Sequence, residues 1–181
     1  MEGVKFMLTP DKLKKAFNKV EDENWILRSF LKEQEPEEVD KLVNDLHKEL
    51  FEGFDCVACS NCCKDIVPLV EENEIKVISE RLRMTDAAFT DRYLIKTDES
   101  FRINKKPCPF LTENGCSIYD YRPENCREYP FTHKDEIGSR LISLVENCAV
   151  CPVIFEIFKR LKKYYRDEFE EYKEGYQELW G

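Results

Sequence analysis

The apolar positions at the start of the chain repeat with helical spacing. Leu13, Phe17 and Val20 stand four and three residues apart, and a second apolar group follows before residue 32. Side chains at such intervals lie on one face of an α-helix. Residues 9–32 are therefore predicted to be helical.

Two further stretches show the same pattern. After Pro36, one apolar face continues until near Gly53, and it carries Val39, Leu42, Val43, Leu46 and Leu50. After Pro152, apolar residues alternate spacings of three and four, beginning with Ile154, Phe158, Leu161, Tyr165 and Phe169. A proline suits the first turn of a helix, where its missing N–H costs no hydrogen bond. We expect one helix from Pro36 and one long helix from Pro152 to the end.

Shorter elements are predicted between these helices. Residues 71–83 carry apolar side chains at helical spacing, and Thr85 is a suitable N-cap for a short helix that bears Phe89. From about residue 99, short apolar pieces are separated by prolines and a glycine, which is typical of short strands or extended loops. The stretch Arg140 to Val145 is also predicted to be a strand.

Charge and composition narrow the function classes. The chain has 181 residues, a net charge of -9 and a pI near 5.0. No basic stripe dominates, so nucleic acid is not expected as a partner. The start, MEGVKFMLTPDKLKK, lacks the apolar core of a signal peptide, and no apolar run reaches the roughly 18 residues of a membrane span. We expect a cytoplasmic protein with no membrane partner.

Nine cysteines, all between residues 56 and 151, indicate metal binding. Cytosolic thiols are normally reduced, so metal ligands are favoured over a disulfide framework. The first cluster, C-x2-C-x2-C-C, consists of Cys56, Cys59, Cys62 and Cys63. Two-residue gaps let thiolates converge on one metal, as in zinc and iron–sulfur sites. Adjacent side chains usually point apart, so Cys62 and Cys63 are expected to serve two sites, or one of them to bridge two metals.

The remaining thiols extend this set. They are Cys108, Cys116, Cys126, Cys148 and Cys151, of which the last two form another two-residue gap. Two metal sites with four thiol ligands each would use eight of the nine cysteines and leave one over. Either one cysteine is spare, or one bridges, or one site takes a different ligand set.

Other polar residues near the cysteines are considered for a role at the metal site. Arg122 and Arg127 flank Cys126 closely enough to donate hydrogen bonds to the ligand sulfurs of a bound cofactor. His47 falls on a predicted helix, three residues before Leu50, and is expected to be a surface or face residue. His133 is a possible ligand, but the cysteines already suffice without it.

These features predict an α+β fold, mainly helical, with a short irregular strand and loop middle organised around a cysteine-ligated metal site. Three segments are expected within one compact domain: an N-terminal helical segment over 1–55, a cysteine-cluster metal-binding core over 56–151, and a long C-terminal helix over 152–181.

Four sequence blocks resemble a known family. CVACSNCC, PCPFL, GCSIYDYRPENCREYPF and NCAVCP occur in the order of the cysteine-cluster family described as a zinc- or iron-chelating domain. The resemblance implies metal binding by Cys56, Cys59, Cys62, Cys63, Cys108, Cys116 and Cys126, and extends to Cys148 and Cys151. It also favours the role given to Arg122 and Arg127, which recur in the family's motif.

Two functions remain open. The C-x2-C-x2-C run favours an iron–sulfur cluster with a redox or oxidoreductase-associated role, together with a protein redox partner. The alternative is a non-enzymatic module in which Zn²⁺ closes the irregular middle and the helices contact a partner. The sequence contains no G-x-G-x-x-G, P-loop or H-E-x-x-H motif. Whether the protein is an enzyme is therefore left open.

Overall fold

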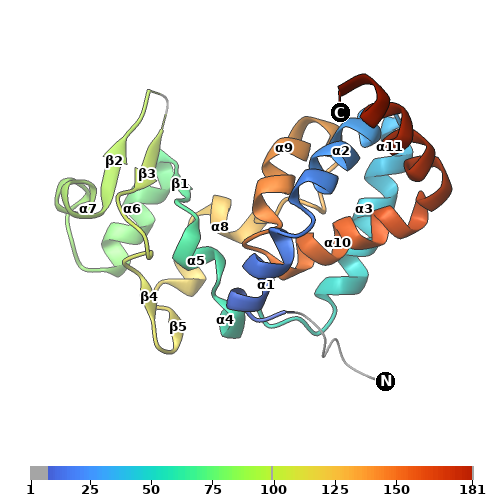
Figure 1. Cartoon of the computed structure of the whole chain (residues 1–181). Coiled ribbons are helices and arrows are strands. Elements are labelled where there is room, and N and C mark those ends of the chain that lie inside the picture. Colours follow the sequence, from blue (N-terminus) through green and yellow to red (C-terminus); the bar gives the residue numbers. More distant parts are fainter. Residues whose placement is uncertain (1–7, 99, 181) are drawn as a thin grey trace. The chain divides into compact units, whose positions relative to one another are not determined.

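The chain divides into two compact units. The computed structural model describes residues 8–98 and 100–180, so the first seven residues of the stretch in which a signal peptide was sought lie outside it. One unit, the helical unit, comprises residues 1–54 and 130–181, and the other, the cysteine unit, comprises Asp55–Tyr129. The cysteine unit is thus an insertion in the sequence of the helical unit (Figure 1).

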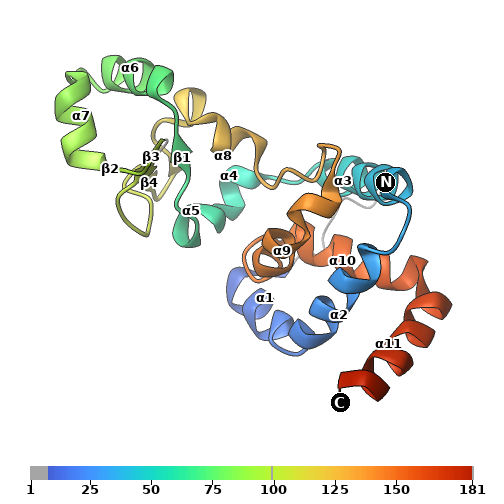
Figure 2. The same ribbon diagram turned by 90° about the horizontal axis from the view of Figure 1, so that it is seen from above.

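Six helices form the helical unit over the residues that the structure describes. They are α1 (Pro10–Phe17), α2 (Glu21–Leu31), α3 (Pro36–Phe51), α9 (Ile137–Asn147), α10 (Pro152–Tyr164) and α11 (Arg166–Trp180). Helix α9 packs on α2 and α3, α10 packs on α1 and α3, and α11 packs on α2 (Figures 1 and 2). Their buried faces include Leu13, Leu27, Val43, Leu141, Ile154, Phe158 and Phe169. Burial of such apolar side chains is the main stabilising contribution to this unit.

Two predicted helices are each divided in two. The 9–32 helix breaks between Phe17 and Glu21, where Lys19 and Val20 donate i→i+3 hydrogen bonds that tighten the turn. The C-terminal helix breaks at Tyr165, whose φ and ψ of -93° and 29° lie outside the helical region. In both places the apolar stripe continues across the break, so the spacing alone could not reveal it.

The predicted strand at Arg140–Val145 is wrong, because this stretch belongs to helix α9. The buried residues of α9 are Ile137, Leu141, Leu144 and Val145, at intervals of four, three and one. This is the spacing of a helix face, and packing against α2 and α3 outweighs the weak strand preference of the apolar residues.

A carboxylate from another helix caps the start of α9. Residue Glu136 is left-handed, with φ of 63°, and contributes no side-chain cap. Instead, Asp40 of α3 accepts hydrogen bonds from the backbone N–H groups of Glu136 (2.7 Å) and Ile137 (2.8 Å). These donors would otherwise have no partner within the helix.

We therefore expect Asp40→Ala to lower the free energy of unfolding by about 1–2 kcal/mol, the usual cost of losing a cap. Urea titration followed by circular dichroism measures the change. Asp45→Ala on the same helix is the matched control, because Asp45 is 55% exposed and pairs only with surface lysines. Equal destabilisation by both variants would contradict the capping role.

The cysteine unit combines short helices with two small sheets. Its helices are α4 (Cys56–Cys59), α5 (Cys62–Asp65), α6 (Glu72–Arg81), α7 (Asp86–Tyr93), a 3-10 helix (Tyr119–Tyr121) and α8 (Glu124–Glu128). The strands β1 (Leu69–Val70), β3 (Phe101–Ile103) and β2 (Leu94–Lys96) form one antiparallel sheet in the order β1-β3-β2. The strands β4 (Leu111–Thr112) and β5 (Gly115–Cys116) form a separate hairpin.

An apolar cluster forms the core of the cysteine unit. It contains Val70, Ile75, Ile78, Phe89, Leu94, Ile103, Phe110 and Ile118, and Cys108 and Cys116 pack against it. Thr85 caps α7 as predicted, since its hydroxyl accepts from the Ala88 N–H at 3.2 Å. The prediction of a mainly helical chain with short strands in its middle is confirmed.

Among the described residues, no single helix is long and apolar enough to cross a bilayer. Only α9 and α10 taken together reach that length and composition, and the two are bent by 115° with respect to each other.

Candidate metal centre

The first four cysteines lie on two single-turn helices joined by a tight reversal. Asp55 caps α4 by accepting a hydrogen bond from the Ala58 N–H at 3.0 Å. Ser60 then adopts the left-handed conformation, with φ of 46° and ψ of 18°, and ends α4. The chain reverses there into α5, so Cys56 and Cys59 lie on α4 whereas Cys62 and Cys63 lie on α5.

Backbone contacts hold the next two cysteine segments near these helices. The Cys108 N–H donates to the Cys63 carbonyl at 2.8 Å. Cys116 lies on β5, and the preceding residue, Gly115, has φ of +96°. A Cβ at Gly115 would lie 2.6 Å from Cγ1 of Val57, so only glycine lets β5 approach α4 this closely.

Polar contacts position Cys126 on α8. The Asn125 side chain accepts a hydrogen bond from the Leu69 N–H at 3.2 Å, which ties α8 to β1. Glu74 of α6 accepts from the Glu124 N–H at 2.6 Å. Glu74 and Asn125 were not singled out in the sequence, because their partners are 50 and 56 residues away and no local pattern marks such contacts.

The Cys63 thiol affects the ionisation of thiols from several segments of the cysteine unit. Its ionisation would further raise the pKa values of four cysteines whose pKa is already raised by burial: Cys56, Cys108, Cys116 and Cys126. A hydrogen bond to Cys62, and then burial, raise the pKa of Cys63 itself. For Cys126 the burial and its three neighbouring thiols raise the pKa to about 12. Segments separated by more than sixty residues are therefore brought to within interaction distance of one sulfur.

Arg122 is the cation of this group. The pKa values of Cys56, Cys63, Cys116 and Cys126 are all raised overall. The positive charge of the Arg122 guanidinium acts in the opposite direction on each of them and offsets part of the increase. Its Nη1 donates to the Tyr119 carbonyl at 2.6 Å, and the guanidinium carbon lies 3.7 Å from the centre of the Tyr119 ring. These two contacts fix the charge beside the thiols, where it would favour a thiolate-bound cofactor.

Arg127 has different partners. Its Nη1 donates to the Arg122 carbonyl, and its Nη2 lies 3.7 Å from Oε1 of Glu74. Arg127 thus contacts the backbone of the arginine that faces the sulfurs and an acid on α6.

The donor chemistry of the cysteine unit fits a thiolate-bound metal. The unit contains seven thiols, and the raised pKa of Cys126 reflects first the cost of burying a charged thiolate and second the repulsion from neighbouring thiolates. A cation removes this cost, because metal-bound thiols are deprotonated and share the positive charge. As the side chains stand, no three Cys, His, Asp or Glu groups among the described residues are close enough together to hold an ion. Binding of a metal would therefore require the cysteine side chains to move closer together.

Cys148 and Cys151 lie in the other unit. Cys148 ends α9 and Cys151 precedes α10, and both are buried, with 0% and 7% exposure. Burial, followed by the proximity of Cys151, raises the pKa of Cys148 well above its usual value. The structure thus separates the nine predicted ligands into seven in the cysteine unit and two in the helical unit.

The two histidines lie together in the helical unit. The ring centroids of His47 and His133 are 5.1 Å apart, and Nδ1 of His47 is 2.7 Å from the buried Thr132 hydroxyl. Burial, then the positive charges of His133 and Lys48, lower the pKa of His47 to about 4. His47 is therefore a half-buried residue of α3.

This environment predicts a loss of stability in mild acid. An unfolded histidine protonates near pH 6.5, whereas folded His47 does so near 4. Its contribution is complete above about pH 6.5 and is lost as the pH falls toward 4, by on the order of 1 kcal/mol after solvent screening. Urea titrations of wild type and His47→Gln between these pH values measure the difference. Identical pH profiles would contradict the assignment.

Comparison with known proteins gives one match. The model of the family described as "CxxCxxCC: Putative zinc- or iron-chelating domain" matches residues 55–151, which is more than half of the chain. Neither the curated proteins nor the solved structures contain a match. The matched range includes the whole cysteine unit and extends through Cys148 and Cys151.

Proposed function

Because the chain belongs to this cysteine-cluster family, for which Zn²⁺ and iron are the alternative metals, we propose that its cysteine unit binds an iron–sulfur cluster and that the protein transfers electrons to or from a redox partner. The observation that carries the proposal is the grouping of thiols around Cys63. The cluster would be held by cysteines from the set Cys56, Cys59, Cys62, Cys63, Cys108, Cys116 and Cys126.

The spacing and surroundings of the thiols support iron–sulfur over zinc. Either site needs four ligands, so the seven thiols of the cysteine unit are enough for both. The C-x2-C-x2-C spacing is the one that opens many cluster-binding runs. Arg122 supplies a fixed positive charge, which would stabilise the more negative, reduced state of a bound cluster and so raise its reduction potential.

One observation favours the alternative, a structural zinc site. The helices α4 and α5 have four residues each, and none of these residues is buried. Only Asn61, which precedes α5, is buried in this part of the chain. Segments with so little core of their own are often held in place by zinc in small domains. In that case the unit would present a rigid surface and carry out no electron transfer.

Metal and sulfide analysis after anaerobic purification separates the two functions. We expect brown protein with broad absorption between roughly 300 and 500 nm, and iron with acid-labile sulfide in equal amounts. Dithionite should bleach the absorption, and oxidation should restore it. Colourless protein with stoichiometric zinc would replace the redox proposal by the structural one, and protein without either metal after reconstitution would refute both.

That Cys148 and Cys151 also bind the metal stays a prediction. Cys148→Ala keeps a small apolar side chain at a fully buried position, so the variant is expected to remain folded. If the pair provides ligands, the variant should contain less metal per chain than wild type under the same purification.

A further inference from the structure

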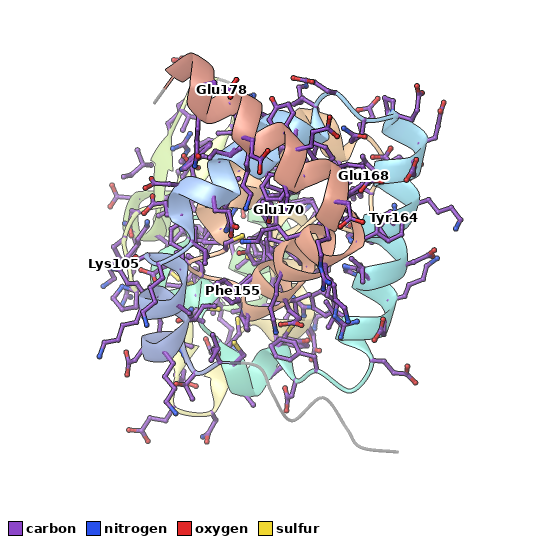
Figure 3. All side chains as sticks on the ribbon, turned by 45° about the vertical axis from the view of Figure 1, so that its right-hand side comes forward. Lys105, Phe155, Tyr164, Glu168, Glu170 and Glu178 are labelled. Carbon is purple, nitrogen blue, oxygen red and sulfur yellow. The ribbon has the colours of Figure 1, made fainter. Side chains whose placement is uncertain are left out.

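An apolar groove lies on the helical unit between α1 and the first turns of α10. Its volume is about 490 Å³, within the range of binding sites for small molecules and peptide segments. Its apolar lining comes from Leu8, Leu13, Ala16, Val20, Pro152 and Phe155. Phe155, labelled on α10 in Figure 3, is only partly buried. The groove therefore offers apolar surface that the fold itself does not cover among the described residues.

One side of the groove carries unneutralised positive charge. Lys12, Lys15 and Lys19 line it and are exposed, and none of the three forms an ion pair with a described residue. On the opposite side, Glu156 is neutralised by Lys159 at 3.3 Å and by Arg160 at 3.5 Å. In a chain of net charge -9, this groove is locally cationic.

The spacing of the lysines defines the shape of a complementary anion. Lys12, Lys15 and Lys19 are three and four residues apart, so they follow one side of α1 and the turn after it. At a rise of about 1.5 Å per residue they extend over roughly 10 Å. An acidic helix carries carboxylates at the same intervals, whereas a fatty carboxylate carries its charge at one end only.

We propose that this groove binds an acidic amphipathic helix of a partner protein. The apolar face of that helix would lie against Phe155 and Ala16, and its carboxylates would face the three lysines. A membrane surface fits less well, because the large apolar residues of α1, Leu13 and Phe17, are 0% and 6% exposed and cannot enter a bilayer while the unit is folded.

Fluorescence anisotropy with a labelled probe peptide tests the proposal. The probe is an amphipathic peptide of about 18 residues with leucines on one face and glutamates on the flanks. A second peptide has the same composition in scrambled order. We expect the full-length protein to bind the first peptide at least tenfold more tightly than the second, with affinity decreasing as salt is added.

Matched variants locate the site. Lys12→Gln/Lys15→Gln/Lys19→Gln should weaken binding at least tenfold, and Phe155→Ala should weaken it without changing the salt dependence. The control, Lys14→Gln/Lys41→Gln/Lys163→Gln, removes the same charge from exposed lysines outside the groove and should stay within twofold of wild type. Thermal melting checks that each variant is folded.

Three results would overturn the proposal. Equal weakening by the two triple variants would show that binding depends on overall charge. Displacement of the peptide by vesicles containing phosphatidylglycerol, with loss of vesicle binding in the groove variant, would make the ligand a lipid surface. Equal binding of the scrambled peptide would show that no helical face is recognised.

Discussion

Cys63→Ser is expected to lose most of the bound metal, and more of it than any other single cysteine substitution. The reason is the position of Cys63, whose sulfur interacts with the thiols of four different segments of the cysteine unit. A serine hydroxyl at this position would remain protonated at neutral pH and is a poor ligand for zinc or iron. Metal per chain is measured by elemental analysis after identical purification.

Two controls sharpen this result. Cys56→Ser changes a residue that is exposed overall, although its thiol is partly desolvated, and is expected to cause a smaller loss. Lys64→Ala changes the exposed neighbour of Cys63 and should leave the metal content unchanged. If Cys63→Ser and Cys56→Ser lose metal equally while both remain folded by circular dichroism, the central role of Cys63 is wrong.

Removing the metal is expected to loosen the cysteine-bearing segments at least tenfold, measured as faster amide exchange, while α11 keeps its protection. The segments 55–65 and 107–129 contain mostly loops and single-turn helices, so few backbone hydrogen bonds hold them without a bound ion. Helix α11 belongs to the helical unit and anchors Phe169, which is 1% exposed, in that unit's core. Hydrogen exchange with mass spectrometry, before and after chelation under reducing conditions, measures both.

The helices α6 and α7 provide the internal comparison for this experiment. Both contribute to the apolar core of the cysteine unit through Ile78 and Phe89, so their protection should decrease less than that of the loops. Uniform loss across the cysteine unit would mean that the metal holds the whole unit together. Unchanged exchange in 55–65 would mean that no ion orders this segment.

The sequence predicted most helices because their apolar faces are long and regular. Thr85 and Pro36 begin helices as expected, since caps and first-turn prolines act through local contacts. Helix α9 was not predicted, because its start depends on a contact that is distant in the sequence. Its start depends on Asp40, 96 residues earlier in the chain, and its apolar residues include few strong helix formers.

The candidate site was predictable in its residue types and less so in its arrangement. Cysteine spacing identified all nine thiols, and the family match includes each of them. Spacing could not reveal that Cys63 lies among thiols from distant segments, or that Cys148 and Cys151 belong to a different unit. Both depend on tertiary contacts, which leave no periodic trace in the sequence.

Because the cysteine unit interrupts the sequence of the helical unit, the two units are synthesised in a fixed order. The ribosome releases α1, α2 and α3 first, but their partners α9, α10 and α11 are translated only after Tyr129. The whole cysteine unit emerges from the ribosome before α9, α10 and α11 do, so its thiols can meet an ion while the helical unit is still incomplete. Metal supply during translation would therefore influence the yield of mature protein more strongly than metal added later.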